Sequence, residues 1–214
     1  MSKLIDKKLI DYINEVDSSL PAPGGGSVMG VIGSLACALA GMVGHLTVNK
    51  KKFSQLSKEE QDSFNSALEK IKEIKTYLTD IADKDAESFN MFMEAMKMPK
   101  NTEEEKYKRN CALSEASEKS ISVPFNALKY CYDLIPLFDI ILKYGNNGVI
   151  TDILSAYVLI FACAKGSVLN ININMPFINN DAFLENIKSN SMQYIKEIEN
   201  KFYSIENEIS LFKI

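Results

Sequence analysis

One carboxylate, Asp85, stands where an apolar side chain is expected. Between residues 58 and 98, apolar residues recur at helical spacing: Phe64, Leu68, Ile71, Ile74, Leu78, Ile81, Phe89, Phe92 and Met96. Asp85 falls on this stripe, whereas Asp80 and Asp83 fall off it. Burying a carboxylate is costly unless it is paired or functional, and burial moves its pKa toward the range useful for proton transfer. Asp85 is therefore either a proton-transfer group or a carboxylate satisfied by a lysine or a helix terminus.

Arg109 is the only arginine among 24 basic residues. Arginine can hold a carboxylate through two parallel hydrogen bonds, whereas lysine is a point charge. The other residues on the predicted helix face of Arg109 are small: Ala112, Ala116 and Ser120. Antiparallel packing across a turn at 98–101 would place Arg109 beside about residue 90. We expect Arg109 to line a pocket with Asp85 or to pair with it, the alternative being an exposed position kept by chance.

The segment Gly24-Gly25-Gly26-Ser27 precedes an apolar run and predicts a helix N-terminus. Exposed backbone amides and the helix dipole suit an anion there, although a plain hairpin between helices is the alternative. The segment is neither a dinucleotide fingerprint nor a P-loop, because no strand precedes it and no Gly-Lys-Ser/Thr follows. Lys50-Lys51-Lys52 follows the run and is either a polyanion contact or a solvated loop. The lone histidine, His45, is expected to be a helix-end or core residue rather than a catalyst.

Helical periodicity accounts for most of the chain, and no internal repeat or strand pair is present. The expected helices cover 3–18, 27–48, 58–98, 102–143, 152–169 and 181–210. Ser2 is the expected cap of the first helix, and Thr151 or Asp152 that of the fifth. The fourth helix is expected to kink or restart at Pro124 and to end near Gly145. Capping boxes are predicted at Ser57–Glu60 and Thr102–Glu105. Residues 170–174 alternate with period two, so helix and strand remain open there. We expect one all-α domain over 1–214, a multi-helix bundle with a Gly-rich loop opening a buried helix.

Residues 27–48 contain no Asp, Glu, Lys or Arg, which raises the question of a membrane span. The run is only mildly apolar, and we expect no second segment of this kind, so a span is rejected. Small residues repeat at helical spacing at 33, 37 and 41, and again at 36, 40 and 44. Such faces allow close helix packing and predict a central buried helix or one at a subunit interface.

The composition is that of a globular protein: 214 residues, 46% hydrophobic and 24% charged. A net charge of -4 argues against binding to nucleic acid or to an anionic membrane. The four cysteines, Cys37, Cys111, Cys131 and Cys163, show no metal-finger or CxxC spacing. We expect four reduced, buried thiols, and a cytoplasmic protein without a signal peptide.

Together these segments resemble the cyclodeaminase domain of formiminotransferase-cyclodeaminase, a family that includes free-standing bacterial methenyltetrahydrofolate cyclohydrolases. The matching residues run in order along nearly the whole chain: Pro21-Ala22-Pro23-Gly24-Gly25-Gly26-Ser27-Val28, Met42-Val43, Leu46-Thr47, Lys50-Lys51-Lys52-Phe53, Asp85, Ser88-Phe89, Ala95, Lys97-Met98-Pro99-Lys100, Arg109, Ala112, Ala116, Val123-Pro124, Gly145-Asn146, Asp152, Ala156, Gly166, Asn170-Ile171 and Asn174. Asn49 departs from the pattern, which has glycine there.

The resemblance implies a helical homodimer that binds reduced folate, which has an anionic glutamate tail, possibly polyglutamylated, and a flat pterin. It implies proton transfer by Asp85. It gives orientation or anion binding to Gly25, Gly26, Ser27, Lys50 and Arg109, and contacts with the pterin edge to Asp152, Asn170 and Asn174. No metal and no cofactor beyond the tetrahydrofolate substrate are expected.

The implied activity is closure of 5-formiminotetrahydrofolate to 5,10-methenyltetrahydrofolate with release of ammonia, a step of histidine degradation linked to a formiminotransferase. The alternative is a methenyltetrahydrofolate cyclohydrolase that forms 10-formyltetrahydrofolate. A third hypothesis, from another class, is a non-catalytic helical dimerisation module. Sequence alone leaves these alternatives open.

Overall fold

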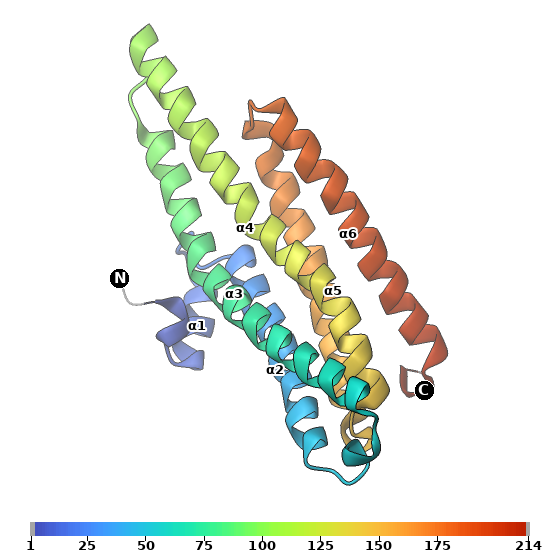
Figure 1. Ribbon diagram of the computed structural model, residues 1–214. Helices are drawn as coiled ribbons and strands as arrows, with labels where there is room; N and C mark the ends of the chain where they lie inside the picture. Colours follow the sequence, from blue (N-terminus) through green and yellow to red (C-terminus); the bar gives the residue numbers. More distant parts are fainter. Residues whose placement is uncertain (1–2, 213–214) are drawn as a thin grey trace.

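The computed structural model describes residues 3–212, in which six α-helices and no strand are found (Figure 1). The helices are α1 (Leu9–Val16), α2 (Gly25–Val48), α3 (Lys58–Lys97), α4 (Glu103–Tyr144), α5 (Ile150–Asn174) and α6 (Asp181–Glu208). Short 3₁₀ turns join or flank them: η1 (Leu4–Asp6), η2 (Phe53–Gln55), η3 (Asn147–Val149), η4 (Met175–Phe177) and η5 (Ser210–Phe212). The predicted all-α fold is confirmed.

Helices α2 to α5 form the central bundle. Each packs against the next along the chain, and α5 returns to pack against α2. Short connections make sequential neighbours antiparallel, as in other four-helix arrangements. Helix α6 covers α4 and α5, and the short α1 lies beside the middle of the bundle (Figure 1). All five long helices contribute buried side chains to one core.

Both predicted capping boxes are present. At the start of α3, Glu60 N donates to Ser57 Oγ at 3.2 Å, and Ser57 N donates to Glu60 Oε2 at 2.9 Å. At the start of α4, Thr102 and Glu105 make the same reciprocal pair. These bonds satisfy amides that the first turn of a helix leaves unpaired, which is why the sequence places these two N-termini correctly.

Several other boundaries differ from expectation. Helix α4 continues through Pro124 without a restart and also passes Pro136, because packing of this long helix against its neighbours outweighs one lost hydrogen bond at each proline. Helix α5 begins at Ile150 after Val149, so neither Thr151 nor Asp152 is its cap. Residues 170–174, left open above, are helical.

The N-terminal segment is not one helix over 3–18. Extended backbone at Lys7 and Lys8 separates η1 from α1. Leu4 N instead donates to Asp83 Oδ1 on α3 at 2.5 Å, which ties this segment to the bundle. The predicted cap Ser2 lies outside the described residues.

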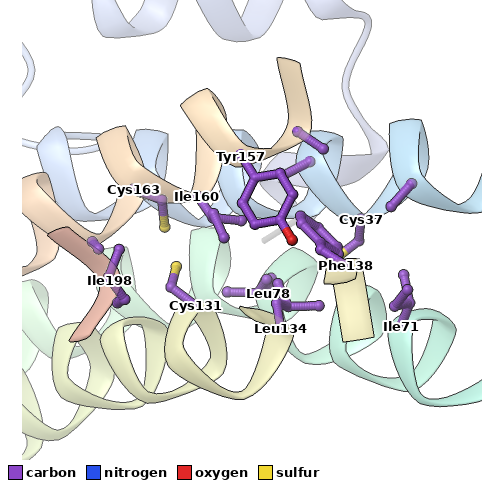
Figure 2. Packing of buried hydrophobic residues seen from close by; sticks show 14 of the residues in the cluster. Cys37, Ile71, Leu78, Cys131, Leu134, Phe138, Tyr157, Ile160, Cys163 and Ile198 are labelled. Carbon is purple, nitrogen blue, oxygen red and sulfur yellow. The ribbon is translucent and has the colours of Figure 1, made fainter. Parts of the chain in front are cut away.

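Three of the four cysteines lie together in the core. Cys37, Cys131 and Cys163 come from α2, α4 and α5, and the last two face each other (Figure 2). Burial raises the pKa of the Cys37 thiol to about 12, and the Cys163 thiol donates to the Met29 carbonyl at 3.1 Å. All four cysteines are free, as predicted, but Cys111 is exposed, so the expectation of four buried thiols is wrong for that residue.

Among residues 3–212, two helical segments, not one, are long and apolar enough to cross a membrane by length and composition: Gly25–Val48 and Asn147–Phe177. The expectation that no second such segment exists is therefore wrong. Both segments belong to helices of the central bundle that pack against each other. They bury 44% and 39% of their most apolar windows. Both still expose large apolar side chains: Leu35, Met42, Leu46, Val158, Leu169 and Ile173.

Candidate active site

The N-terminus of α2 meets the carboxylate of Asp85, which projects from the middle of α3. The Ser27 backbone N–H donates to Asp85 Oδ2 at 2.9 Å. A Cβ atom at Gly26 would overlap the same carboxylate, so only glycine allows the Asp85 side chain to lie this close to the start of α2. The predicted anion site at the start of α2 is thus filled, at least in part, by a carboxylate of the chain itself.

The surroundings of Asp85 suit proton transfer. Burial raises the pKa of the Asp85 carboxyl above its ordinary value, and the hydrogen bond from the Ser27 backbone amide opposes this shift only in part. The side chain is half-buried rather than enclosed. A carboxyl with a raised pKa holds and releases a proton closer to neutral pH than an exposed aspartate does.

Tyr12 also lies at this site, although it was not predicted as a site residue. The hydroxyls of Tyr12 and Ser27 share a hydrogen bond of 3.1 Å, and Tyr12 is the only buried residue of α1. Burial raises the pKa of Tyr12, and the negative charge of Asp85 adds to this effect. Tyr12 therefore stays a neutral phenol. Periodicity gave no signal for it, because an irregular loop joins Tyr12 to the start of α2.

Two predicted pterin contacts lie beside the same helix start. A Cβ atom at Gly25 would lie 3.6 Å from Asn170 Nδ2, an ordinary contact. Asn170 Nδ2 donates to the Gly166 carbonyl at 2.8 Å, and Asn174 Nδ2 donates to the Asn170 carbonyl at 3.0 Å. Each side-chain amide thus donates one N–H to a backbone carbonyl of its own helix. Within residues 3–212, neither amide oxygen accepts a hydrogen bond, so both can accept one from a ligand.

Apart from Arg109, the predicted site residues divide into two groups. Gly25, Gly26, Ser27, Asp85, Asn170 and Asn174 lie together at one end of the α2–α5 pair. Lys50 follows the other end of α2, a helix about 36 Å long. Asp152 lies in the first turn of α5, near that same far end. Lys50 and Asp152 thus do not reach Asp85 within one chain.

Arg109 also lies away from Asp85. Its Nη2 donates to the Met96 carbonyl at 3.4 Å, so the antiparallel hairpin places Arg109 beside residue 96 rather than residue 90. Ser120, not Arg109, lies opposite the segment that follows Asp85, with its Oγ 3.4 Å from the Ser88 carbonyl. The expected pairing of Asp85 with Arg109 is therefore wrong. The register of the α3–α4 hairpin is therefore shifted by about six residues along α3 from an even count across 98–101.

His45 lies exposed near the C-terminal end of α2. It is far from Asp85, since the length of α2 separates the two positions. This agrees with its interpretation as a helix-end residue. Within residues 3–212, no group of three or more His, Cys, Asp or Glu side chains is placed to hold a metal ion.

Comparison with known proteins places these features in context. The family model described as "Formiminotransferase-cyclodeaminase" matches residues 8–193. A methenyltetrahydrofolate cyclohydrolase of Methylorubrum extorquens is 32% identical over 81% of this chain and 82% of its own length. The formimidoyltransferase-cyclodeaminase of Mus musculus is 31% identical over 85% of this chain, which spans only 33% of that longer protein.

A solved structure resembles the whole fold. The crystal structure of a formiminotetrahydrofolate cyclodeaminase from Thermotoga maritima superposes with a TM-score of 0.82 and 27% sequence identity. The match covers 96% of each chain, so it includes the helices that carry Asp85, the Gly-rich start of α2 and the two asparagines of α5.

Proposed function

The chain belongs to the formiminotransferase-cyclodeaminase family, and from that membership we propose that it closes 5-formiminotetrahydrofolate to 5,10-methenyltetrahydrofolate with release of ammonia. It is an enzyme of folate one-carbon chemistry, as its relatives' names indicate. The observation that carries the proposal is Asp85, a half-buried carboxyl of raised pKa held at the start of α2. The resemblance to the family assigns proton transfer to the same residue.

The reaction needs one proton to move between two nitrogens. N10 attacks the carbon of the protonated formimino group on N5, and a tetrahedral carbon bridging N5 and N10 forms. The proton on N10 then leaves, and the former imino nitrogen gains a proton. That nitrogen departs as ammonia, and the positive charge remains on the methenyl bridge. A single carboxylate that accepts the first proton and delivers it to the leaving nitrogen is sufficient.

The residues around Asp85 have complementary roles. The Ser27 backbone N–H fixes one carboxylate oxygen, which leaves the other free to exchange the proton. The neutral Tyr12 phenol and the Ser27 hydroxyl form a polar edge beside it. Asn170 and Asn174 offer amide oxygens to the N–H groups of a pterin. Held this way, N5 and N10 stay aligned with the carboxylate, and such alignment lowers the barrier to ring closure.

A cyclohydrolase is the second candidate, supported by the Methylorubrum extorquens relative at 32% identity. Water, rather than N10, would then add to the bridging carbon through the same tetrahedral geometry. The two activities are separated by comparing kcat/KM for 5-formiminotetrahydrofolate and for 5,10-methenyltetrahydrofolate. We expect the first substrate to be preferred, with ammonia released and no effect of a metal chelator. A clear preference for the methenyl substrate would replace the first assignment by the second.

We also propose a place for the enzyme in the cell. The longer relatives are named formimidoyltransferase-cyclodeaminase, and this chain spans about a third of them. A separate formiminotransferase would then supply its substrate, in the cytoplasm, during degradation of histidine. Measuring the rate at which 5,10-methenyltetrahydrofolate forms in crude extracts with and without a formiminotransferase would test that supply.

We propose in addition that the protein is a homodimer formed through the outer faces of α2 and α5. Leu35, Met42 and Leu46 on α2 are exposed, and so are large apolar residues of the adjacent α5. Exposed large apolar side chains on two adjacent helices are typical of an interface. A two-fold axis that lies in the plane of the interface and runs perpendicular to the helices pairs them antiparallel, which also keeps the two Lys50-Lys51-Lys52 clusters apart.

An antiparallel pairing has a consequence for the active site. In such a dimer, opposite ends of the two α2–α5 pairs lie against each other. Lys50 and Asp152 of a second copy therefore approach the end that carries Asp85. These are the two predicted site residues that a single chain leaves at its far end. The dimer would thereby complete the folate site.

Leu35→Glu should convert the dimer to monomer and reduce turnover along with it, because it buries a charge in the proposed interface. Sedimentation at micromolar concentration measures the first effect, and the folate assay measures the second. Met192→Glu is the matched control, since Met192 is exposed on α6, which is not part of the proposed interface. A wild-type monomer across this concentration range, or a dimer unaffected by Leu35→Glu, would exclude this interface.

A further inference from the structure

Arg109 has a guanidinium without an adequate partner. Within residues 3–212, it forms no ion pair with any carboxylate. Among the described residues, its Nη2 makes only long contacts of 3.4 Å with the Met96 carbonyl oxygen and Sδ, and its buried Nε has no hydrogen-bond partner. A desolvated donor on a charged group is costly when unpaired. The position is therefore built for an acceptor that comes from outside the chain.

Arg109 lies at the end of a row that begins at Asp85. On α3, Phe92 and Met96 follow Asp85 by about two and about three turns, so all three share one face of the helix. Arg109 contacts the last of them. This part of α3 and the facing part of α4 form a hairpin that projects beyond the rest of the bundle (Figure 1). The row thus leads outward from the candidate active site.

An aromatic pair lies partway along the row. The rings of Phe92 and Phe177 meet edge to face, with centroids 5.1 Å apart. Phe177 belongs to η4, directly after the end of α5 that carries Asn174, and it remains 44% exposed. An exposed aromatic edge of this kind can pack against an aryl ring of a ligand.

We propose that this row binds the tail of the folate, with Phe92 and Phe177 against the p-aminobenzoyl ring and Arg109 paired with a carboxylate of the glutamate. The proposal rests on the proposed function, which places N5 and N10 at Asp85. Arginine suits a carboxylate because two parallel hydrogen bonds match its geometry.

The spacing agrees with this assignment. Asp85 and Met96 are separated by about 16 Å along α3. From N10 to the glutamate carboxylates, an extended tail reaches on the order of 10 Å, given bonds of about 1.3–1.5 Å. One hydrogen bond of about 3 Å at each end completes the distance. A folate with its reacting nitrogens at Asp85 therefore brings its glutamate to Arg109.

The test compares two ligands that differ only in the glutamate. Dissociation constants are measured for 5-formyltetrahydrofolate and for 5-formyltetrahydropteroate, which lacks it. Wild-type protein should bind the folate about 10- to 100-fold more tightly, the worth of hydrogen bonds to a charged group. Arg109→Met should remove that preference and leave pteroate affinity unchanged. Lys108→Met is the matched control, because Lys108 lies on the same hairpin and is already paired with Glu104.

The outcomes are separable. Wild-type protein that binds neither ligand would overturn both this proposal and the proposed function. A wild-type preference that survives in Arg109→Met would overturn the tail site alone, as would an equal loss of affinity for both ligands. Dissociation of the dimer in Arg109→Met would instead identify a carboxylate of the second subunit as the partner. If Arg109→Met does not fold, Arg109→Lys serves, and a partial loss of the preference is expected because the charge remains but the paired geometry does not.

Discussion

Asp85→Asn should reduce turnover by about 10²–10⁴-fold, the usual contribution of general acid–base catalysis. Asparagine keeps the size of the side chain and can still accept the hydrogen bond from the Ser27 backbone amide. It cannot take the proton from N10 or return it to the departing nitrogen. Affinity for 5-formyltetrahydrofolate should therefore change little, and steady-state kinetics with a parallel binding measurement will separate the two effects.

The same substitution should leave the protein as stable as before or more stable. Burial raises the pKa of Asp85 in the folded state, so the folded protein binds this proton more tightly than the unfolded chain does. The free energy of unfolding consequently falls as the pH rises through the interval between the unfolded and folded pKa values, and it stays lower above that interval. Asparagine removes this penalty.

The stability gain of Asp85→Asn should thus be largest near neutral pH and vanish below about pH 4, the ordinary aspartate range. Thermal or urea unfolding at several pH values measures it. A loss of several kcal/mol at neutral pH would mean that the carboxylate is a structural partner instead. A stable variant with near-normal turnover would remove Asp85 from the mechanism.

Gly26→Ala should disable the enzyme even though it adds only a methyl group. The new Cβ would overlap the Asp85 carboxylate, so either the carboxylate rotates away or the start of α2 moves. Displacement of a catalytic group by about 1 Å can cost 10²-fold in rate. Overpacking of this kind also lowers the free energy of unfolding by about 1–3 kcal/mol. Turnover and urea unfolding of the purified variant measure both effects.

Gly25→Ala provides the matched control for Gly26→Ala. Its Cβ would lie 3.6 Å from Asn170 Nδ2, an ordinary van der Waals contact, and it meets no part of Asp85. We expect turnover within a few-fold of wild type. Equal damage from both substitutions would indicate that any side chain at the start of α2 is harmful, and that the contact between Gly26 and Asp85 has no special role.

Features with a local sequence signal were the ones that could be predicted. The two capping boxes, the apolar stripe of α3 and the Gly-rich start of α2 each depend on residues a few positions apart, and each is present in the structure. Asp85 was found because it interrupts a periodic pattern. The resemblance to a known family then gave this residue a chemical role that periodicity alone left open.

Features that depend on packing between distant segments could not be predicted. The continuity of α4 through two prolines comes from its neighbours, not from its own sequence. The hydrogen bond between Tyr12 and Ser27 crosses a loop without any repeating pattern. The placement of Arg109 depends on the register of the α3–α4 hairpin. Arg109 lies beside residue 96, about two helical turns farther from Asp85 than the expected position beside residue 90.

The most direct measurement is a single turnover of 5-formiminotetrahydrofolate with enzyme in excess, in which the methenyl absorbance and the released ammonia are followed together. Wild-type protein should form the two products one to one in a single phase. Asp85→Asn protein, in the same excess and at a concentration that binds all of the substrate, should form both at the slow rate expected without proton transfer. Methenyl product at the wild-type rate from Asp85→Asn, or no ammonia from wild-type protein, would contradict the assignment of cyclodeamination to this carboxylate.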